Sequence, residues 1–162
     1  MNGNKYLLSI LVDNEPGVLS RIAGLFSGRG FNIDSLSVAK TTDPGQSRIT
    51  MVTKCEPSII EQIKKQLNKL INVITVNDLT EKRYVQRQLS MVKVHAHIDK
   101  RAEVLRIVDI FRCRVVDVGH EHYTVEISGD DEKLEAFLSL LKPMGIIEIV
   151  STGSIAVARE NV

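Results

Sequence analysis

The sequence is poor in the residue types that build stacking surfaces and disulfide frameworks. It has no tryptophan, three tyrosines and four phenylalanines among 162 residues. Without aromatic platforms, recognition of bases or sugars by stacking is not expected. The two cysteines, Cys55 and Cys113, lie far apart and outside any paired spacing. That usage is typical of reduced thiols in a cytoplasmic protein rather than of disulfides.

Long apolar runs and an excess of charge are also missing. No apolar run reaches the roughly 18 residues that indicate a transmembrane helix, and the N-terminal residues lack the basic segment and apolar run of a signal peptide. The formal net charge of +1 gives no bulk attraction to nucleic acid or to an anionic membrane. We therefore expect a cytoplasmic protein that binds neither nucleic acid nor membrane.

Hydrophobic periodicity divides the first half of the chain into six predicted elements. Helices with apolar residues three and four positions apart are expected after Pro16 and after Pro57, the first of them ended by Gly28–Gly30. Strands are expected at 6–12, 31–38, 47–53 and 73–77. The order β-α-β-β-α-β is the split arrangement of a ferredoxin-like fold.

The same order recurs in the second half. Asp99 is expected to cap one helix, and a second helix is expected to begin at Gly129–Glu132 and end at Lys142 and Pro143. Strands are expected at 89–96, 114–118, 123–127 and 146–150. The polar segment between the halves reads as a linker. We therefore predict an α+β protein of two tandem ferredoxin-like βαββαβ domains, 1–78 and 89–162, joined by a linker at 79–88.

The junction between the first strand and the first helix has the features of a ligand-binding loop. Pro16 suits the first turn of a helix, and Gly17 lets a ligand approach the backbone closely. A helix N-terminus attracts a carboxylate or phosphate, and the amide of Asn14 can both donate and accept hydrogen bonds. These parts suit a small zwitterion such as an amino acid. The alternative is an ordinary strand-to-helix turn capped by Asn14 or Asp13.

The ordered set of motifs resembles a known family. The strand, the segment Asn14–Leu19, the helix and the segment Gly30–Ile33 resemble an ACT domain, the amino-acid-sensing module. The fuller pattern through Leu36, continued by Ser47–Thr50 and by matches in the second half such as Val92–Val94, is similar to the small regulatory subunit of acetohydroxyacid (acetolactate) synthase. The resemblance covers nearly the whole chain.

This resemblance implies a regulatory subunit without a catalytic site of its own. Family members work in branched-chain amino-acid (valine, leucine, isoleucine) biosynthesis, where they activate a large catalytic subunit and confer feedback inhibition by valine. The thiamine diphosphate, Mg²⁺ and FAD of the holoenzyme are expected on that large subunit, which the C-terminal domain helps to engage. Valine binds between two ACT domains of a homodimer. Carried over to this sequence, the valine site comprises Asn14, Glu15, Pro16, Gly17, Val18, Leu19, Asn32 and Ile33, with Asn32 and Ile33 facing the loop across the dimer.

Other signals leave alternatives open. His95 with His97, and His120 with His122, would form a zinc or nickel site if the two pairs met in space, and a metal-dependent enzyme would then be a rival function. A free-standing ACT sensor that acts on another enzyme or on a transcription regulator is a second rival. The basic cluster Lys82, Arg83 and Arg87 in the linker is a solvated segment or, as a hypothesis, a contact with an acidic surface of the catalytic subunit.

Overall fold

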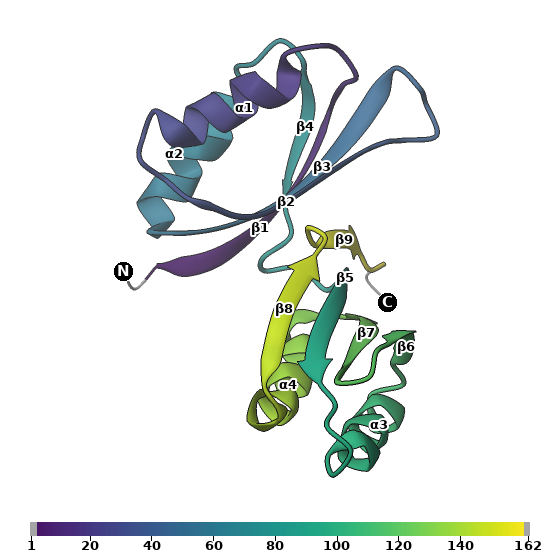
Figure 1. The fold of residues 1–162 in the computed structure, drawn as a ribbon. Helices are drawn as coiled ribbons and strands as arrows, with labels where there is room; N and C mark the ends of the chain where they lie inside the picture. The colour runs from purple at the N-terminus through teal and green to yellow at the C-terminus, as the bar shows by residue number, and fades with distance from the viewer. Residues whose placement is uncertain (1–2, 161–162) are drawn as a thin grey trace. The chain divides into compact units, whose positions relative to one another are not determined.

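The computed structural model of the protein describes residues 3–160 and divides the chain into two units. The first unit comprises Met1–Val85 and Gly153–Val162, and the second comprises Gln86–Thr152. Each unit has an antiparallel sheet with two helices packed on one face (Figure 1). The predicted α+β class with two ferredoxin-like βαββαβ units in tandem is confirmed.

The first unit follows the predicted order of elements. Its strands are paired in the order β2-β3-β1-β4, so β2 and β4 are the edge strands. The elements are β1 (Asn4–Asp13), α1 (Val18–Ser27), β2 (Ile33–Lys40), β3 (Gln46–Cys55), α2 (Pro57–Leu67) and β4 (Val73–Asp78).

The core of this unit lies between the sheet and its two helices. Leu8 and Ile10 point to the helix side of β1, since alternate residues of a strand share one face. On α1, Val18, Ile22 and Phe26 are buried at four-residue intervals, which places them on one stripe of the helix. Burial of each of these apolar side chains stabilises the fold by about 1.5–3 kcal/mol. The helices therefore cover the face of the sheet on which Leu8 and Ile10 lie, with the buried stripe of α1 turned toward it.

The second unit repeats the arrangement with strand order β6-β7-β5-β8. Its core contains Phe137 of the second helix, which meets Phe111 edge to face. The elements are β5 (Tyr84–His95), α3 (Arg101–Ile110), β6 (Arg114–Val118), β7 (His122–Gly129), α4 (Asp131–Leu141), the 3-10 turn η1 (Lys142–Met144) and β8 (Ile146–Ser151). No helix within residues 3–160 is long and apolar enough to cross a membrane.

The N-termini of the helices differ from the prediction at two places. The predicted cap Asp99 of α3 is wrong: Lys100 holds the N-cap position, and the backbone N–H groups of Lys100 and Arg101 donate to the carbonyl oxygen of His97. Pro16 does not lie in the first turn of α1, because the N-cap is Gly17 and the helix begins at Val18. The predicted start of α4 is confirmed, since Asp130 accepts a hydrogen bond from the Lys133 backbone N–H.

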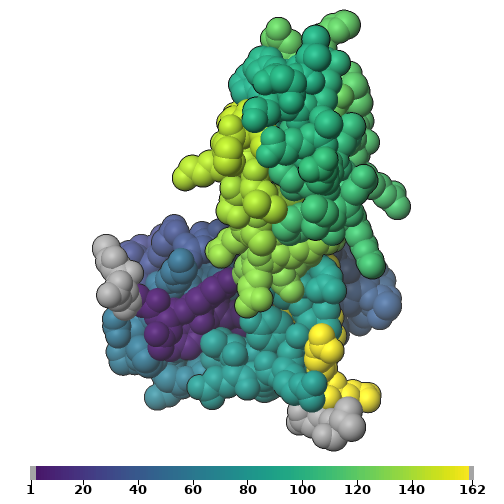
Figure 2. All heavy atoms as spheres, turned by 90° about the horizontal axis from the view of Figure 1, so that it is seen from below, coloured from purple at the N-terminus to yellow at the C-terminus, as the bar shows by residue number. Residues whose placement is uncertain are grey.

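A ninth strand, β9 (Ile155–Ala158), belongs to the first unit and was not predicted. It pairs with β5, and beside this pairing the backbone N–H of Arg159, just after β9, donates to the carbonyl oxygen of Arg83, just before β5, at 2.7 Å. In the space-filling view the yellow C-terminal residues lie against teal residues from the middle of the chain (Figure 2). Ala156 packs with Leu7, Val52 and Leu79 on the face of the first sheet opposite the helices.

The units therefore differ from the expected domain boundaries at both ends of the second half. Residues 153–162 were expected in the C-terminal domain, but the chain returns to the first unit at Gly153. The Ser154 N–H donates to Ser35 Oγ, and a Cβ on Gly153 would lie 2.2 Å from the Leu36 carbonyl oxygen. The expected linker, 79–88, already contains the first residues of β5, which begins at Tyr84. Both differences arise from long-range strand pairing that local sequence does not encode.

Attachment of β9 can be tested with two neighbouring substitutions. We expect Ala156→Asp to lower the free energy of unfolding by about 2–4 kcal/mol, because it places a carboxylate in an apolar cluster. Ile155→Asp is the matched control: Ile155 is 56% exposed, against 6% for Ala156, and its substitution should cost about 0.5 kcal/mol or less. Chemical denaturation measures both values. Equal losses for the two variants would contradict this packing of β9.

Candidate functional site

The loop between β1 and α1 is tied to the hairpin that joins β2 and β3. The Asn14 backbone N–H donates to the Gly45 carbonyl oxygen at 2.8 Å, and Asn14 Nδ2 donates to the Pro44 carbonyl oxygen at 3.0 Å. Asn14 Oδ1 accepts from Ser47 Oγ at 3.2 Å. The amide of Asn14 therefore fixes the loop against the hairpin. The predicted cap at Asn14 or Asp13 is wrong, because Gly17 holds the N-cap position of α1 and no side chain of the described residues caps this helix.

Gly17 forms the N-cap of α1 in a left-handed conformation. Its φ is 85°, a region that side chains with a Cβ disfavour, while a Cβ built there would meet no atom within 4 Å. Conformation, rather than crowding, is thus what requires glycine in the absence of a ligand. The first turn of α1 contains no acidic residue. The positive end of the helix dipole is therefore not compensated by this helix's own first turn.

Glu15 takes part in a polar network that sequence reasoning missed. Asn72 is buried, and its Nδ2 donates to Glu15 Oε2 at 3.1 Å and to Asp13 Oδ2 at 3.4 Å. Asn72 Oδ1 in turn accepts from Arg21 Nη1 at 2.6 Å. The carboxylate of Glu15 thus helps to hold the loop in place. Asn72 lies 57 residues from Glu15 in the chain, and no local signal marks it as a partner.

The apolar residues of the predicted site divide between core and surface. Val18 is 4% exposed and packs within the core of the first unit, so its side chain serves the fold. Leu19 is 42% exposed, next to the exposed Pro16. Leu19 therefore presents apolar surface beside the uncapped helix end.

Asn32 and Ile33 lie far from this loop within one chain. Asp13, at the end of β1, pairs with Gln46 of β3, whereas Ile33 pairs with Thr53. Those two partners are seven residues apart on β3, or about 24 Å in an extended strand. The structure therefore brings Asn14, Glu15, Pro16, Gly17, Val18 and Leu19 together but leaves Asn32 and Ile33 at the other end of the sheet.

Asn32 is exposed, and its side-chain nitrogen and its backbone carbonyl oxygen form hydrogen bonds. Its Nδ2 donates to Asp34 Oδ1 at 2.8 Å, and its carbonyl oxygen accepts from Thr53 Oγ1 at 2.6 Å. The following strand, β2, pairs with β3 on one side, and its other edge pairs with no strand among residues 3–160. This edge is where another strand could add to the sheet.

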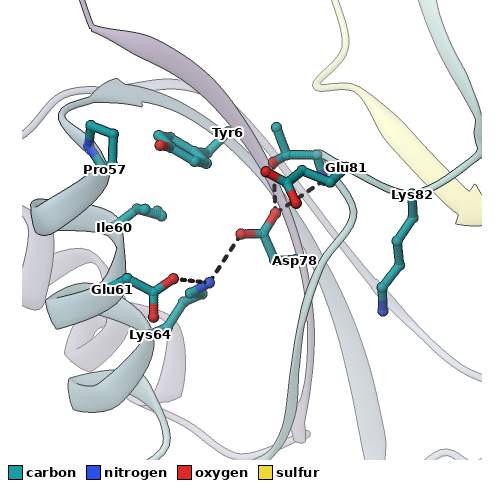
Figure 3. A pocket seen from close by; sticks show the side chains of 9 residues that line it. Tyr6, Pro57, Ile60, Glu61, Lys64, Asp78, Glu81 and Lys82 are labelled. Carbon is teal, nitrogen blue, oxygen red and sulfur yellow. Dashed lines mark hydrogen bonds and ion pairs between the residues drawn. The ribbon is translucent and has the colours of Figure 1, made fainter.

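A cleft of about 510 Å³ lies beside α2 and contains an ion cluster (Figure 3). Lys64 Nζ lies between a Glu61 carboxylate oxygen and Asp78 Oδ2, the latter at 3.1 Å. Thr80 donates to Asp78 Oδ1 through both its backbone N–H and its hydroxyl. The charges of Glu61, Lys64 and Asp78 are satisfied by one another, so these three residues join α2 to the end of β4.

The ionisation of this cluster follows from its contacts. Burial raises the pKa of Asp78, but the hydrogen bonds from Thr80 and Lys64 outweigh it, so the pKa lies below its ordinary value of 3.8. The hydrogen bond to Glu61 raises the pKa of Lys64 above its ordinary value, against an opposing effect of burial. Both shifts favour the charged forms, so Asp78 and Lys64 are ionised at neutral pH.

The two predicted histidine pairs come together through His95, which lies beside both His97 and His122. His95 and His97 stack with their ring centroids 5.3 Å apart, and His95 is the cross-strand partner of His122. Within the described part of the chain, no group of three or more His, Cys, Asp and Glu side chains is arranged to hold a metal ion. His120 is engaged through its carbonyl oxygen, which accepts from the Arg101 guanidinium.

The two thiols offer no activated nucleophile. Cys55 is buried and Cys113 is half-buried, and both are free. Burial raises the pKa of the Cys55 thiol and that of the Cys113 thiol. A raised pKa lowers the fraction of reactive thiolate at neutral pH.

Comparison with known proteins gives matches over both units. A family model described as the AHAS small subunit-like ACT domain matches residues 8–75, and one described as the small subunit of acetolactate synthase matches residues 87–160. The chain is 48% identical to the acetolactate synthase small subunit of Mycolicibacterium smegmatis, covering 95% of this chain and 91% of that protein. It is 45% identical to a probable acetolactate synthase small subunit of Archaeoglobus fulgidus, covering 97% and 98%. The crystal structure of the acetolactate synthase small subunit from Thermotoga maritima matches with a TM-score of 0.86 at 40% identity, covering 98% of this chain and 99% of that one.

The contribution of Asp78 to stability can be tested by its pH dependence. Because its pKa is lowered by folding, its stabilising effect is present above the ordinary value and is lost as the pH falls through the folded value. We expect Asp78→Asn to cost about 1 kcal/mol at neutral pH and the difference from wild type to shrink below pH 3.8. Denaturant unfolding at a series of pH values measures this difference.

Glu81→Gln is the control, since Glu81 lines the same cleft and forms no ion pair among the residues that the structure describes. A loss for Asp78→Asn that stays constant into acid would contradict this assignment.

Proposed function

Because the chain belongs to the family of acetolactate synthase small subunits, we propose that it is the regulatory subunit of an acetolactate synthase in branched-chain amino-acid biosynthesis. Family models match both units, and relatives near 45% identity align over almost their full length. The chain would activate a large catalytic subunit and make it sensitive to feedback inhibition by valine. Thiamine diphosphate, Mg²⁺ and FAD would be held by the large subunit, and the second unit would help to engage it.

The first step toward a valine site is a homodimer through β2. The free edge of β2 and the separation of Asn32 from the β1–α1 loop support this step. If two copies of β2 pair antiparallel about a two-fold axis, the Ile33 end of one strand lies opposite the Lys40 end of the other. The hairpin after Lys40 carries Pro44 and Gly45, which hold Asn14. The pairing would therefore bring the loop of one protomer to Asn32 and Ile33 of its partner.

The second step is the chemistry of the ligand. The uncapped N-terminus of α1 offers backbone N–H groups and a positive dipole end to a carboxylate. The exposed amide of Asn32 supplies an oxygen that can accept from an ammonium group. Leu19 of one protomer and Ile33 of the other would form the apolar wall for the branched side chain. A zwitterion with a short apolar side chain fits these three features together.

Regulation then requires that valine binds two states of the holoenzyme with different affinity. A ligand held between two protomers meets this requirement in principle, because its affinity depends on how the protomers are placed. An apolar wall discriminates by only about 1–3 kcal/mol per methylene, so leucine and isoleucine should act more weakly than valine rather than be excluded.

Reconstitution with the catalytic subunit tests this proposal. Wild type should raise the rate of acetolactate formation by the large subunit, and valine should lower the rate of the complex but not that of the large subunit alone. Gly17→Asp should still activate but should abolish inhibition, because the new carboxylate would repel the carboxylate of valine.

Gly17→Asn is the matched control, since asparagine has the same shape, adopts positive φ equally well and carries no charge. It should weaken inhibition much less than Gly17→Asp. Failure of wild type to alter the activity of any acetolactate synthase large subunit would refute the proposed role, and full valine inhibition of the Gly17→Asp complex would refute the site.

A further inference from the structure

A cavity of about 380 Å³ lies on the face of the first sheet opposite the helices. Ser9, Asn77 and Arg48 project from three strands whose neighbouring residues pack on the helix side. Ser9 and Asn77 are cross-strand partners. Leu79, Lys82 and β9 complete the lining. The site lies entirely within the first unit and uses none of the residues of the proposed valine site.

The charges that line this cavity are all of one sign. Arg48 and Lys82 are its charged residues, and no carboxylate of the described residues lines it. Neither cation forms an ion pair with any residue between positions 3 and 160. Lys64, across the sheet, lies between two carboxylates, whereas the Lys82 ammonium points away from that cluster (Figure 3).

The polar groups around the two cations are placed to bind an anion. Arg48 Nη1 donates to the buried Ser9 hydroxyl at 3.1 Å, which directs the guanidinium along the sheet face. A guanidinium can donate two parallel hydrogen bonds to one phosphate or carboxylate group, and an ammonium adds a point charge. The Asn77 amide supplies further donors. Leu79 and Ala156 give the cavity an apolar wall.

We propose that this cavity binds a phosphate-bearing small molecule, held by Arg48 and Lys82. Two cations without a carboxylate partner match the charge of a phosphate group better than that of a single carboxylate. The volume lies in the range of ligand pockets, about 300–1,000 Å³, so it accommodates a phosphate together with a small organic group against the apolar wall. Because β9 lines the cavity, bound ligand would also hold the C-terminal segment on the sheet.

Calorimetric titration of the full chain at constant ionic strength tests this site. The probes are pyrophosphate and inorganic phosphate, with malonate as a dicarboxylate of equal formal charge to a phosphate dianion. We expect pyrophosphate to bind most tightly, and Lys82→Gln and Arg48→Gln each to raise its dissociation constant about tenfold or more, as loss of a charge-assisted contact does. Lys69→Gln removes an exposed cation outside the cavity and should leave the constant unchanged.

Several results would overturn the assignment. Unchanged affinity in both cavity variants would place the anion elsewhere, and binding of malonate without pyrophosphate would exclude a phosphate ligand. If no anion binds and both variants assemble more weakly with the catalytic subunit, the assignment is also wrong. Arg48 and Lys82 would then contact that subunit rather than a small molecule. Gly17→Asp should bind pyrophosphate as wild type does, so the outcome is independent of the proposed valine site.

Discussion

Antiparallel pairing along β3 is the constraint on which the arrangement of the first unit depends. This strand pairs with β1 on one side and with β2 on the other. The end of β1, which leads into the β1–α1 loop, therefore lies at one end of the sheet, and the beginning of β2 lies at the other. Two groups of residues that the family resemblance assigns to one site are thus held apart by the fold itself. A second copy of the chain, paired through the free edge of β2, is the simplest way to bring them together.

The two faces of the same sheet have different roles. Burial of Leu8, Ile10 and Phe26 commits one face to the helices, which leaves the other face without cover from the first half of the chain. The last residues of the chain supply part of that cover, because Ala156 packs on Leu7 and Val52. What remains beside β9 is the cavity with Arg48 and Lys82. The sheet therefore carries a proposed amino-acid site at its β2 edge and a proposed anion site on its open face.

Local pattern was enough to predict the elements that build the fold. Alternation in β1 and four-residue spacing in α1 are consequences of burying one face of each element, and they are visible in sequence. Pairing between distant segments is not visible in this way. The four residues of β9 have no local signal that places them on a sheet more than 60 residues away in the chain, and Asn72 reaches Glu15 across a similar distance. The position of the strand-to-helix junction was predicted correctly. The contacts of Asn14 could not be predicted, because its amide could equally cap a helix or bind a hairpin, and only the neighbouring Pro44 and Ser47 decide between them.

The central claim is that each valine site is shared between two protomers, and mixed dimers test it most directly. Homodimers of Gly17→Asp and of Asn32→Lys should each bind no valine, since each variant damages every site. A mixed dimer with one chain of each kind, purified through two different tags, would place both substitutions in one site and leave the other site intact. Calorimetry should then find one valine per mixed dimer. A mixed dimer that binds no valine would show that Gly17 and Asn32 act within the same chain and would contradict the account.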